Sequence, residues 1–155
     1  MSAEANLAAK KFTLPEAPRP VANYVTSMQV DRLLFVSGHG PAALAGAKLV
    51  GKLGVDVSVE EGYIAARQTG LGILATLRAA LGSLDRVERV VKVLGMVNAA
   101  PDFTEHPRVI NGCSDLFVEI FGEERGRATR SAVGMGSLPG NIATEIEALV
   151  LVRAD

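Results

Sequence analysis

The sequence has little of what marks several common functional classes. Its 155 residues include one cysteine, two histidines and no tryptophan, and 5% of them are aromatic. A single cysteine excludes an internal disulfide, and two histidines argue against a His-rich metal site. The formal net charge is −1, so no overall positive field exists to hold a nucleic-acid backbone. The apolar runs, such as residues 148–152, are far too short to span a bilayer.

The composition favours a single folded domain. Hydrophobic residues make up 48% of the chain and charged residues 21%, which argues against a disordered chain. The length fits one domain, which we assign to residues 21–155. Residues 1–20 contain three prolines and no apolar signal-peptide core, so we expect a mobile N-terminal arm and a cytoplasmic protein.

Short apolar or β-branched runs predict the strands. Residues 32–37 form an apolar run that stops at a glycine, and residues 48–54 suggest a second short strand. Residues 87–97 are rich in β-branched side chains, and residues 131–135 and 143–152 close the chain as strands.

Two segments carry the period of amphipathic helices. The first begins after Ser58, whose side chain forms a capping box with Glu61, and ends at Gly82. In the second, Thr104 is the predicted cap and Gly122 the end. The order is β-β-α-β-α-β-β, so we predict an α+β fold with two helices packed on one face of a mixed or antiparallel sheet.

The last strand indicates what lies on each side of the sheet. Glu145 and Glu147 share a face with Leu149 and Leu151, and the other face is wholly apolar. If helices cover the second face, the first is open but partly apolar, which suggests that a partner covers it. A homo-oligomer is the simplest partner.

Arg130 and Glu145 are the strongest candidates for chemistry. An arginine at a strand entry can present a fixed fork of donors to a carboxylate. A glutamate with a raised pKa can orient or deprotonate a water molecule. Each also has an ordinary interpretation, as a solvated arginine in a charged turn and as part of an exposed strand face.

Other residues are more ambiguous. The turn Ser37-Gly38-His39-Gly40-Pro41 can hold a small ligand on backbone amides, or it is a β-turn after a strand. We interpret His39 and His106 as surface or turn residues. Cys113 lies on the apolar stripe of the second helix, which favours core packing over a nucleophile. Tyr24 either covers a pocket or packs on the surface.

Together these motifs resemble the YjgF/YER057c/UK114 family, also called the RidA family of reactive imine deaminases. The residues that carry the resemblance are Tyr24, the turn at residues 37–41, the run Ala128–Gly134, Leu138-Pro139 and the segment Thr144–Ala148. The resemblance covers nearly the whole chain after residue 21.

The resemblance implies a chorismate-mutase-like fold and a homotrimer with ligand clefts between subunits. It also implies hydrolysis of 2-imino or 2-enamino acids to 2-keto acids and ammonia, with no cofactor and no metal. Arg130 would bind the substrate carboxylate, Glu145 would position or activate the water, and the Ala132 carbonyl would help to hold that water. Tyr24, Ser37 and Gly38 would shape the pocket, and Asn111 is a looser match.

Two departures from the family pattern leave alternatives open. The usual glutamine after Ser-Gly is His39, and the segment Gly112–Leu116 lacks an aromatic residue that is common there. The alternatives are a non-catalytic trimer that senses a small carboxylate in the same cleft and a partner-binding trimer with a vestigial cleft. The slightly acidic balance does not favour the ribonuclease activity named in older family labels.

Overall fold

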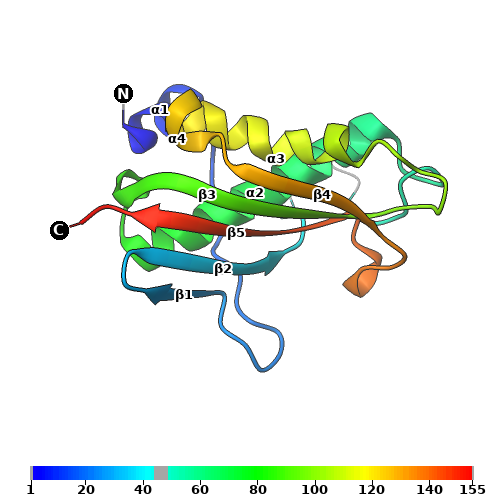
Figure 1. The fold of residues 1–155 in the computed structure, drawn as a ribbon, viewed down its shortest axis with the longest axis horizontal. Helices are drawn as coiled ribbons and strands as arrows, with labels where there is room; N and C mark the ends of the chain where they lie inside the picture. Colours follow the sequence, from blue (N-terminus) through cyan, green and yellow to red (C-terminus); the bar gives the residue numbers. More distant parts are fainter. Residues whose placement is uncertain (1, 44–48, 155) are drawn as a thin grey trace.

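The computed structural model describes residues 2–43 and 49–154. Its centre is a five-stranded sheet in the order β1-β2-β5-β3-β4, with α2 and α3 on one face (Figure 1). The strands are β1 (Ser27–Val30), β2 (Leu33–His39), β3 (Val87–Asn98), β4 (Thr129–Met135) and β5 (Thr144–Val152). Of the strand pairs in the described residues, β3–β4 is parallel and the other three are antiparallel. The mixed sheet and the helices on one face confirm the predicted α+β class.

The helix signals are confirmed at three of the four predicted ends. Helix α2 (Val59–Leu81) begins after the Ser58 capping box and ends at Gly82, which adopts a left-handed conformation. Helix α3 (His106–Phe121) ends at Gly122. The prediction that Thr104 caps α3 is wrong, because the N-cap residue is Glu105 and no side chain caps this helix.

One predicted strand is not formed by the described residues, and one observed strand was not predicted. Lys48 lies outside the described residues, and residues 49–54 form only isolated bridges, from Val50 to Ile142 and from Leu53 to both Val57 and Ala99. Left-handed glycines at positions 51 and 54 turn the chain there. The predicted strand at residues 32–37 is confirmed as β2, and the strand that was missed is β1, whose Val30 pairs with Leu33 in a hairpin.

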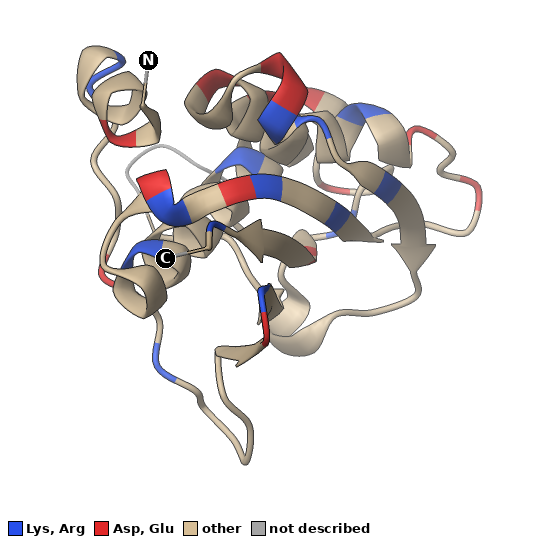
Figure 2. Ribbon diagram, turned by 60° about the vertical axis from the view of Figure 1, so that its left-hand side comes forward, with Lys and Arg blue, Asp and Glu red and all other residues tan. Residues whose placement is uncertain are grey.

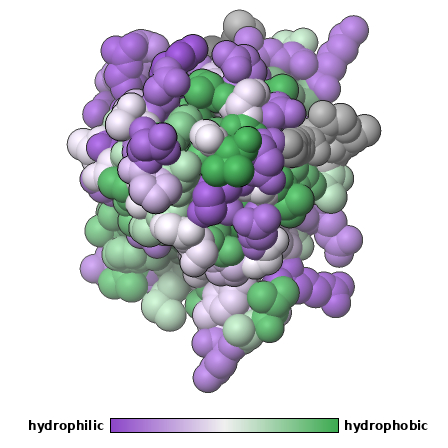
Figure 3. Space-filling model, turned by 90° about the vertical axis from the view of Figure 1, so that its right-hand side faces the viewer, coloured by the Kyte–Doolittle hydropathy of each residue, from purple (hydrophilic) through white to green (hydrophobic). Residues whose placement is uncertain are grey.

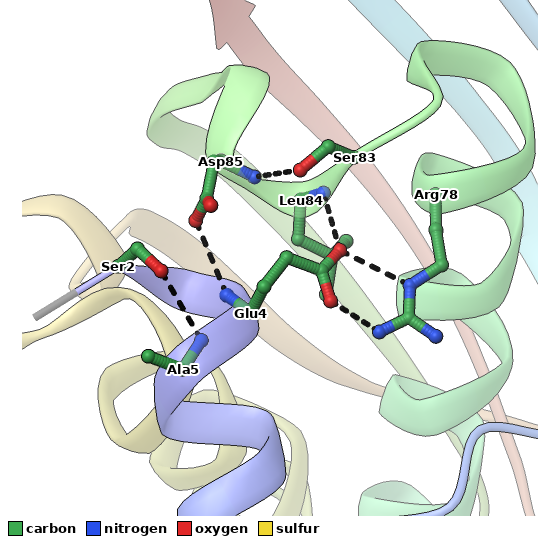
Figure 4. Close-up of polar contacts among 7 residues, drawn as sticks. All are labelled: Ser2, Glu4, Ala5, Arg78, Ser83, Leu84 and Asp85. Atoms are coloured by element: carbon green, nitrogen blue, oxygen red, sulfur yellow. Dashed lines mark hydrogen bonds and ion pairs between the residues drawn. The ribbon is translucent and has the colours of Figure 1, made fainter.

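The N-terminal segment contains a helix that the sequence did not suggest. We expected a mobile arm over residues 1–20, whereas α1 (Ala3–Ala9) packs on the domain with Ala3 and Leu7 buried. The Glu4 carboxylate accepts hydrogen bonds from Arg78 Nε (3.1 Å) and from the Leu84 amide (2.9 Å) at η1 (Leu84–Arg86) (Figure 4). This carboxylate joins α1 to the end of α2.

The core lies between the helices and the sheet. Ile146, Val150 and Val152 of β5 are at most 1% exposed, as predicted for the helix-covered face. The close contact between the two long helices depends on glycine, because a Cβ at Gly112 of α3 would lie 2.0 Å from the Tyr63 carbonyl oxygen of α2. The two short elements α4 (Glu123–Gly126) and η2 (Pro139–Asn141) connect the larger ones.

The opposite face of the sheet is open and partly apolar. Met28, Val30 and Phe35 are each about half exposed there, and Glu147 lies on the same face between them and β4. Charged residues of both signs are interspersed over the molecule (Figure 2). Among the described residues, no helix is both long and apolar enough to cross a membrane.

Candidate functional site

Arg130 is held at the edge of the sheet by neutral oxygen atoms. It lies on β4, and its guanidinium donates to Asn111 Oδ1 (2.8 Å) and to Ser114 Oγ (3.1 Å), both on α3. A weaker contact reaches the Pro107 carbonyl at 3.5 Å. Asn111 and Ser114 are three residues apart and therefore share one face of α3. These contacts orient the guanidinium without neutralising its charge.

Within the described part of the chain, Arg130 forms no ion pair, although acidic side chains are near. It borders a hollow of about 550 Å³ that Asp115, Glu119 and Glu123 also line. Each of these acids has another partner: Tyr63 for Asp115, Arg67 for Glu119 and Arg127 for Glu123. The positive charge of Arg130 thus remains available to an anionic ligand.

Glu145 lies on the open face against the backbone of Gly38. A Cβ built on Gly38 would come within 2.8 Å of Glu145 Oε1, so only glycine allows this approach. The β2–β5 register shifts between Val36 and His39, which indicates a bulge at Ser37 and Gly38. Such bulges often redirect the chain next to functional sites.

The surroundings of Glu145 raise its pKa above its ordinary value. Partial burial is the main cause, because it penalises the charged form, and the nearby charge of Glu147 adds to it. Glu145 is therefore easier to protonate near neutral pH than an exposed glutamate, which suits a group that takes up and returns a proton.

His39 is buried, which contradicts its interpretation as a surface or turn residue. It is 5% exposed, and its Nδ1–H donates to the Ser37 carbonyl at 2.6 Å while Nε2 contacts Thr76 Oγ1 of α2 at 2.7 Å. Burial lowers its pKa, which keeps the ring neutral. The residue that departs from the family pattern points to α2 and not towards Glu145, since it pairs with the buried Ile146.

Tyr24 and Ser37 lie close to Gly38, at the end of β2. Ser37 Oγ donates to the Val25 carbonyl at 2.6 Å, which ties the turn to the segment before β1. Tyr24 is 42% exposed and lines a cavity of about 350 Å³ together with Gly38 and His39. The cavity lies where the N-terminal segment passes the turn.

The predicted site residues thus form two groups. The arginine group consists of Arg130, Asn111 and the neighbouring strand residue Ala132. The glutamate group consists of Glu145, Gly38, Ser37 and Tyr24. Within one group the members are adjacent in the fold, but β3 separates β4 from β5.

The sheet register places the two groups on opposite faces. Arg130 pairs with Val93 of β3, whereas Glu145 pairs with Met96. Residues three apart on a regular strand point to opposite sides, and Val93 is buried under the helices. A single chain therefore does not bring Arg130 and Glu145 together.

The sequence did not identify the polar partners of Arg130 and of His39. Ser114 supports Arg130 and Thr76 supports His39, and both lie on helices far away in sequence. The spacing of Ser114 from Asn111 was the only available signal. Cys113 is fully buried, and burial raises its thiol pKa, which confirms a packing role. No cluster of metal-ligating side chains occurs in residues 2–43 and 49–154.

A family model described as "YjgF/chorismate_mutase-like, putative endoribonuclease" matches residues 4–151. The chain belongs to this YjgF family. Protein TCP17 of Trypanosoma cruzi is 46% identical over 146 residues, which cover 94% of this chain and 91% of that protein. The YjgF-type fold and the predicted family resemblance are thereby confirmed.

Two solved structures of similar proteins extend the YjgF match to the whole fold. Atu1372 of Agrobacterium tumefaciens has a TM-score of 0.88 at 41% identity, with coverage of 97% of this chain and 92% of that one. A Shewanella oneidensis protein described as an endoribonuclease has a TM-score of 0.91 at 33% identity, with coverage of 98% and 100%. Both alignments extend over nearly all of this chain, including its N-terminal part.

Proposed function

We propose that this YjgF-family protein hydrolyses 2-imino and 2-enamino acids to 2-keto acids and ammonia. The observation that carries the proposal is the arginine group, in which neutral groups orient a guanidinium that no carboxylate of residues 2–43 and 49–154 neutralises. A planar fork of donors is suited to bind the carboxylate that all such substrates share.

Glu145 supplies the proton transfers in this proposal. As water attacks C2 of the imine, the carboxylate accepts a proton from it and passes a proton to the nitrogen. The carbon–nitrogen bond of the resulting carbinolamine then breaks, and ammonia leaves with the 2-keto acid as the second product. An enamine first gains a proton at C3 and loses one from its nitrogen, which converts it to the imine. Imines hydrolyse in water unaided, so positioning and proton transfer suffice.

The proposed site forms between two copies of the chain. Arg130 and Glu145 lie on opposite faces of one sheet, so a complete site requires the arginine group of one copy beside the glutamate group of another. The open face, with its half-exposed Met28, Val30 and Phe35, offers apolar surface for such an association. A homotrimer would contain three equivalent sites, with no cofactor required.

The ribonuclease label is less consistent with these residues. Both ring nitrogens of the buried His39 are engaged within the protein, so this histidine cannot serve as an acid or base for RNA cleavage. The net charge of −1 also provides little attraction for a polyanion.

The experiment that tests the proposal generates 2-aminoacrylate with a dehydratase and traps the remaining imine with semicarbazide. We expect the protein to release pyruvate faster than buffer does, and Arg130→Ala to lose at least about 100-fold in kcat/KM. Arg89→Ala is the matched control, because Arg89 is exposed and its ion pair in the described part of the chain is with Glu124. Light scattering should give three times the chain mass of 16.2 kDa.

Release no faster than in buffer would contradict the deaminase proposal. Tight binding of 2-keto acids without turnover would instead support the alternative of a carboxylate-sensing protein. If kcat/KM fell equally in Arg130→Ala and Arg89→Ala, the result would contradict a specific role for Arg130.

A further inference from the structure

A lysine and an asparagine join two loops to the end of β3. Lys52 Nζ donates to Asn98 Oδ1 at 2.7 Å and to the Gly136 carbonyl at 2.6 Å. Asn98 Nδ2 in turn donates to Asn141 Oδ1 at 2.9 Å and to the Gly51 carbonyl at 3.1 Å. Lys52, Asn98, Gly136 and Asn141 together form a loop clamp.

The loop clamp is centred on the buried amide of Asn98. This residue is 0% exposed. Its side-chain oxygen accepts from Lys52, and its side-chain nitrogen donates twice. Without Lys52, the buried oxygen would lose this donor, and an unmet hydrogen-bonding group in the interior is costly. The Asn98 side chain would then have to move, together with the loops that are bound to it.

The loop clamp closes the connection between the two strands that carry the proposed site. Residues 136–143 lead from β4, which carries the arginine group, to β5, which carries the glutamate group. The clamp ties Gly136, at the start of this connection, to Asn141 near its end. The connection lies at the end of the molecule where β5 begins (Figure 1). Hydrophobic and hydrophilic residues lie side by side on this end (Figure 3).

Backbone hydrogen bonds extend the clamp to the start of β5. The Asn98 amide donates to the Ala143 carbonyl at 3.0 Å, and the Ala143 amide donates to the Leu49 carbonyl at 2.9 Å. Glu145 follows two residues later, and its carboxylate lies against Gly38. A shift of Ala143 would therefore displace Glu145 from this contact.

We propose that Lys52 is a positioning residue, which holds Glu145 in place through the loop clamp without touching the substrate. This inference rests on the proposed function. Asn111 and Ser114 orient Arg130 separately, so opening the clamp should affect proton transfer more than carboxylate binding. A misplacement of about 1 Å that originates far from the reacting atoms can lower a rate about 100-fold.

Lys52→Met tests the role of the ammonium, because it removes the charge and keeps most of the alkyl chain. The amount of dehydratase sets the concentration of 2-aminoacrylate in the assay. We expect kcat to fall about tenfold while KM changes less than about twofold. Lys52→Arg retains N–H donors for the two oxygens and should recover most of the rate. Lys11→Met, at an exposed position, is the matched control and should keep the wild-type values.

A second variant opens the other end of the clamp. Asn141 has a φ of 56°, which glycine adopts without strain. Asn141→Gly therefore removes the Oδ1 acceptor while the turn is retained, and we expect kcat to fall about threefold. This variant decides the question if Lys52→Met does not fold. Unchanged kcat in Asn141→Gly and in any folded Lys52→Met would overturn the inference.

Carbon NMR titration of the Glu145 carboxyl distinguishes positioning from a mere loss of folded protein. Partial burial and the charge of Glu147 raise the pKa of Glu145. A Glu145 side chain that leaves Gly38 becomes more exposed, so its pKa should fall towards the ordinary value in Lys52→Met and stay unchanged in Lys11→Met. Loss of folded protein would weaken the signal without moving the titration midpoint. The Glu145→Gln spectrum assigns the signal.

The titration needs no enzyme activity, so it separates this inference from the proposed function. A lowered midpoint in Lys52→Met of a protein that does not hydrolyse imines would overturn only the deaminase proposal. An active wild type whose kcat and midpoint are both unaltered by Lys52→Met would overturn only the role of Lys52. An inactive wild type with an unaltered midpoint would overturn both.

Discussion

The carboxylate of Glu145 occupies the space that a side chain at position 38 would fill, with Oε1 only 2.8 Å from where a Cβ would lie. This contact links the Ser-Gly turn at the end of β2 to a glutamate near the start of β5, the last strand of the chain. Because glycine has no side chain, Gly38 leaves room for the Glu145 carboxylate, the group to which we assign the proton transfers.

Replacement of Gly38 by alanine should therefore displace Glu145. We expect Gly38→Ala to fold normally, because the displaced atoms are the end of a flexible side chain, and to lower kcat/KM about 10–100-fold. Enzyme assays together with thermal unfolding would measure both effects. Full activity in Gly38→Ala would show that the position of Glu145 against Gly38 is unimportant.

The buried His39 should make stability depend on pH. Burial lowers its pKa below the ordinary 6.5 in the folded state, so the unfolded chain binds more protons between the folded pKa and about 6.5. The free energy of unfolding should therefore rise with pH through this window and become constant above it. Urea unfolding at pH 5.5 and 7.5 measures the difference.

His39→Gln is the matching variant, because glutamine cannot titrate and can still form hydrogen bonds. We expect it to show a smaller loss of stability between pH 7.5 and 5.5 than the wild type. The same pH dependence in both proteins would assign the effect to another group.

Glu4 should determine how firmly α1 is attached. Glu4→Gln weakens the charged hydrogen bond to Arg78 and should lower the free energy of unfolding by about 1–2 kcal/mol. Amide exchange in residues 3–9 should accelerate. Glu16→Gln is the control, because the Glu16 side chain is 87% exposed. We expect it to change neither the free energy of unfolding nor the exchange rates. Equal exchange rates in the two variants would contradict this role.

The contact between α2 and α3 at Gly112 predicts a large loss of stability. A methyl group there would lie 2.0 Å from the Tyr63 carbonyl oxygen, so the helices must move apart, and Gly112→Ala should cost about 3 kcal/mol. At Gly136, by contrast, a Cβ would meet no atom within 4 Å, and Gly136→Ala should change stability by less than about 0.5 kcal/mol. Chemical denaturation distinguishes the two.

The sequence predicts the two faces of the sheet well, because alternation along β5 and the helical period of α3 depend on local pattern. The sequence-based prediction failed where contacts between distant residues determine the structure. The hairpin turn between β1 and β2 contains no glycine and has a left-handed Asp31 instead, so the usual hairpin signal was missing. Helix α1 is short, and its attachment depends on Arg78 and η1, which local sequence cannot reveal.

The candidate site shows the same division between local and distant information. Sequence motifs identified Arg130, Glu145 and Gly38 individually. The burial of His39 depends on Thr76, and the support of Arg130 depends on Ser114, and both contacts require the folded helices. The separation of the two groups became visible only from the register of β3 with its two neighbours.

Co-assembly of two inactive variants tests the central claim most directly. Arg130→Ala retains Glu145, and Glu145→Gln retains Arg130, so a site between copies can combine the intact residue of each. Co-expressed and purified through two tags, which retains only mixed trimers, the assemblies should regain about one-third of the wild-type sites, while each variant alone stays inactive. Mixed assemblies with no deaminase activity, beside an active wild type, would contradict a site shared between copies.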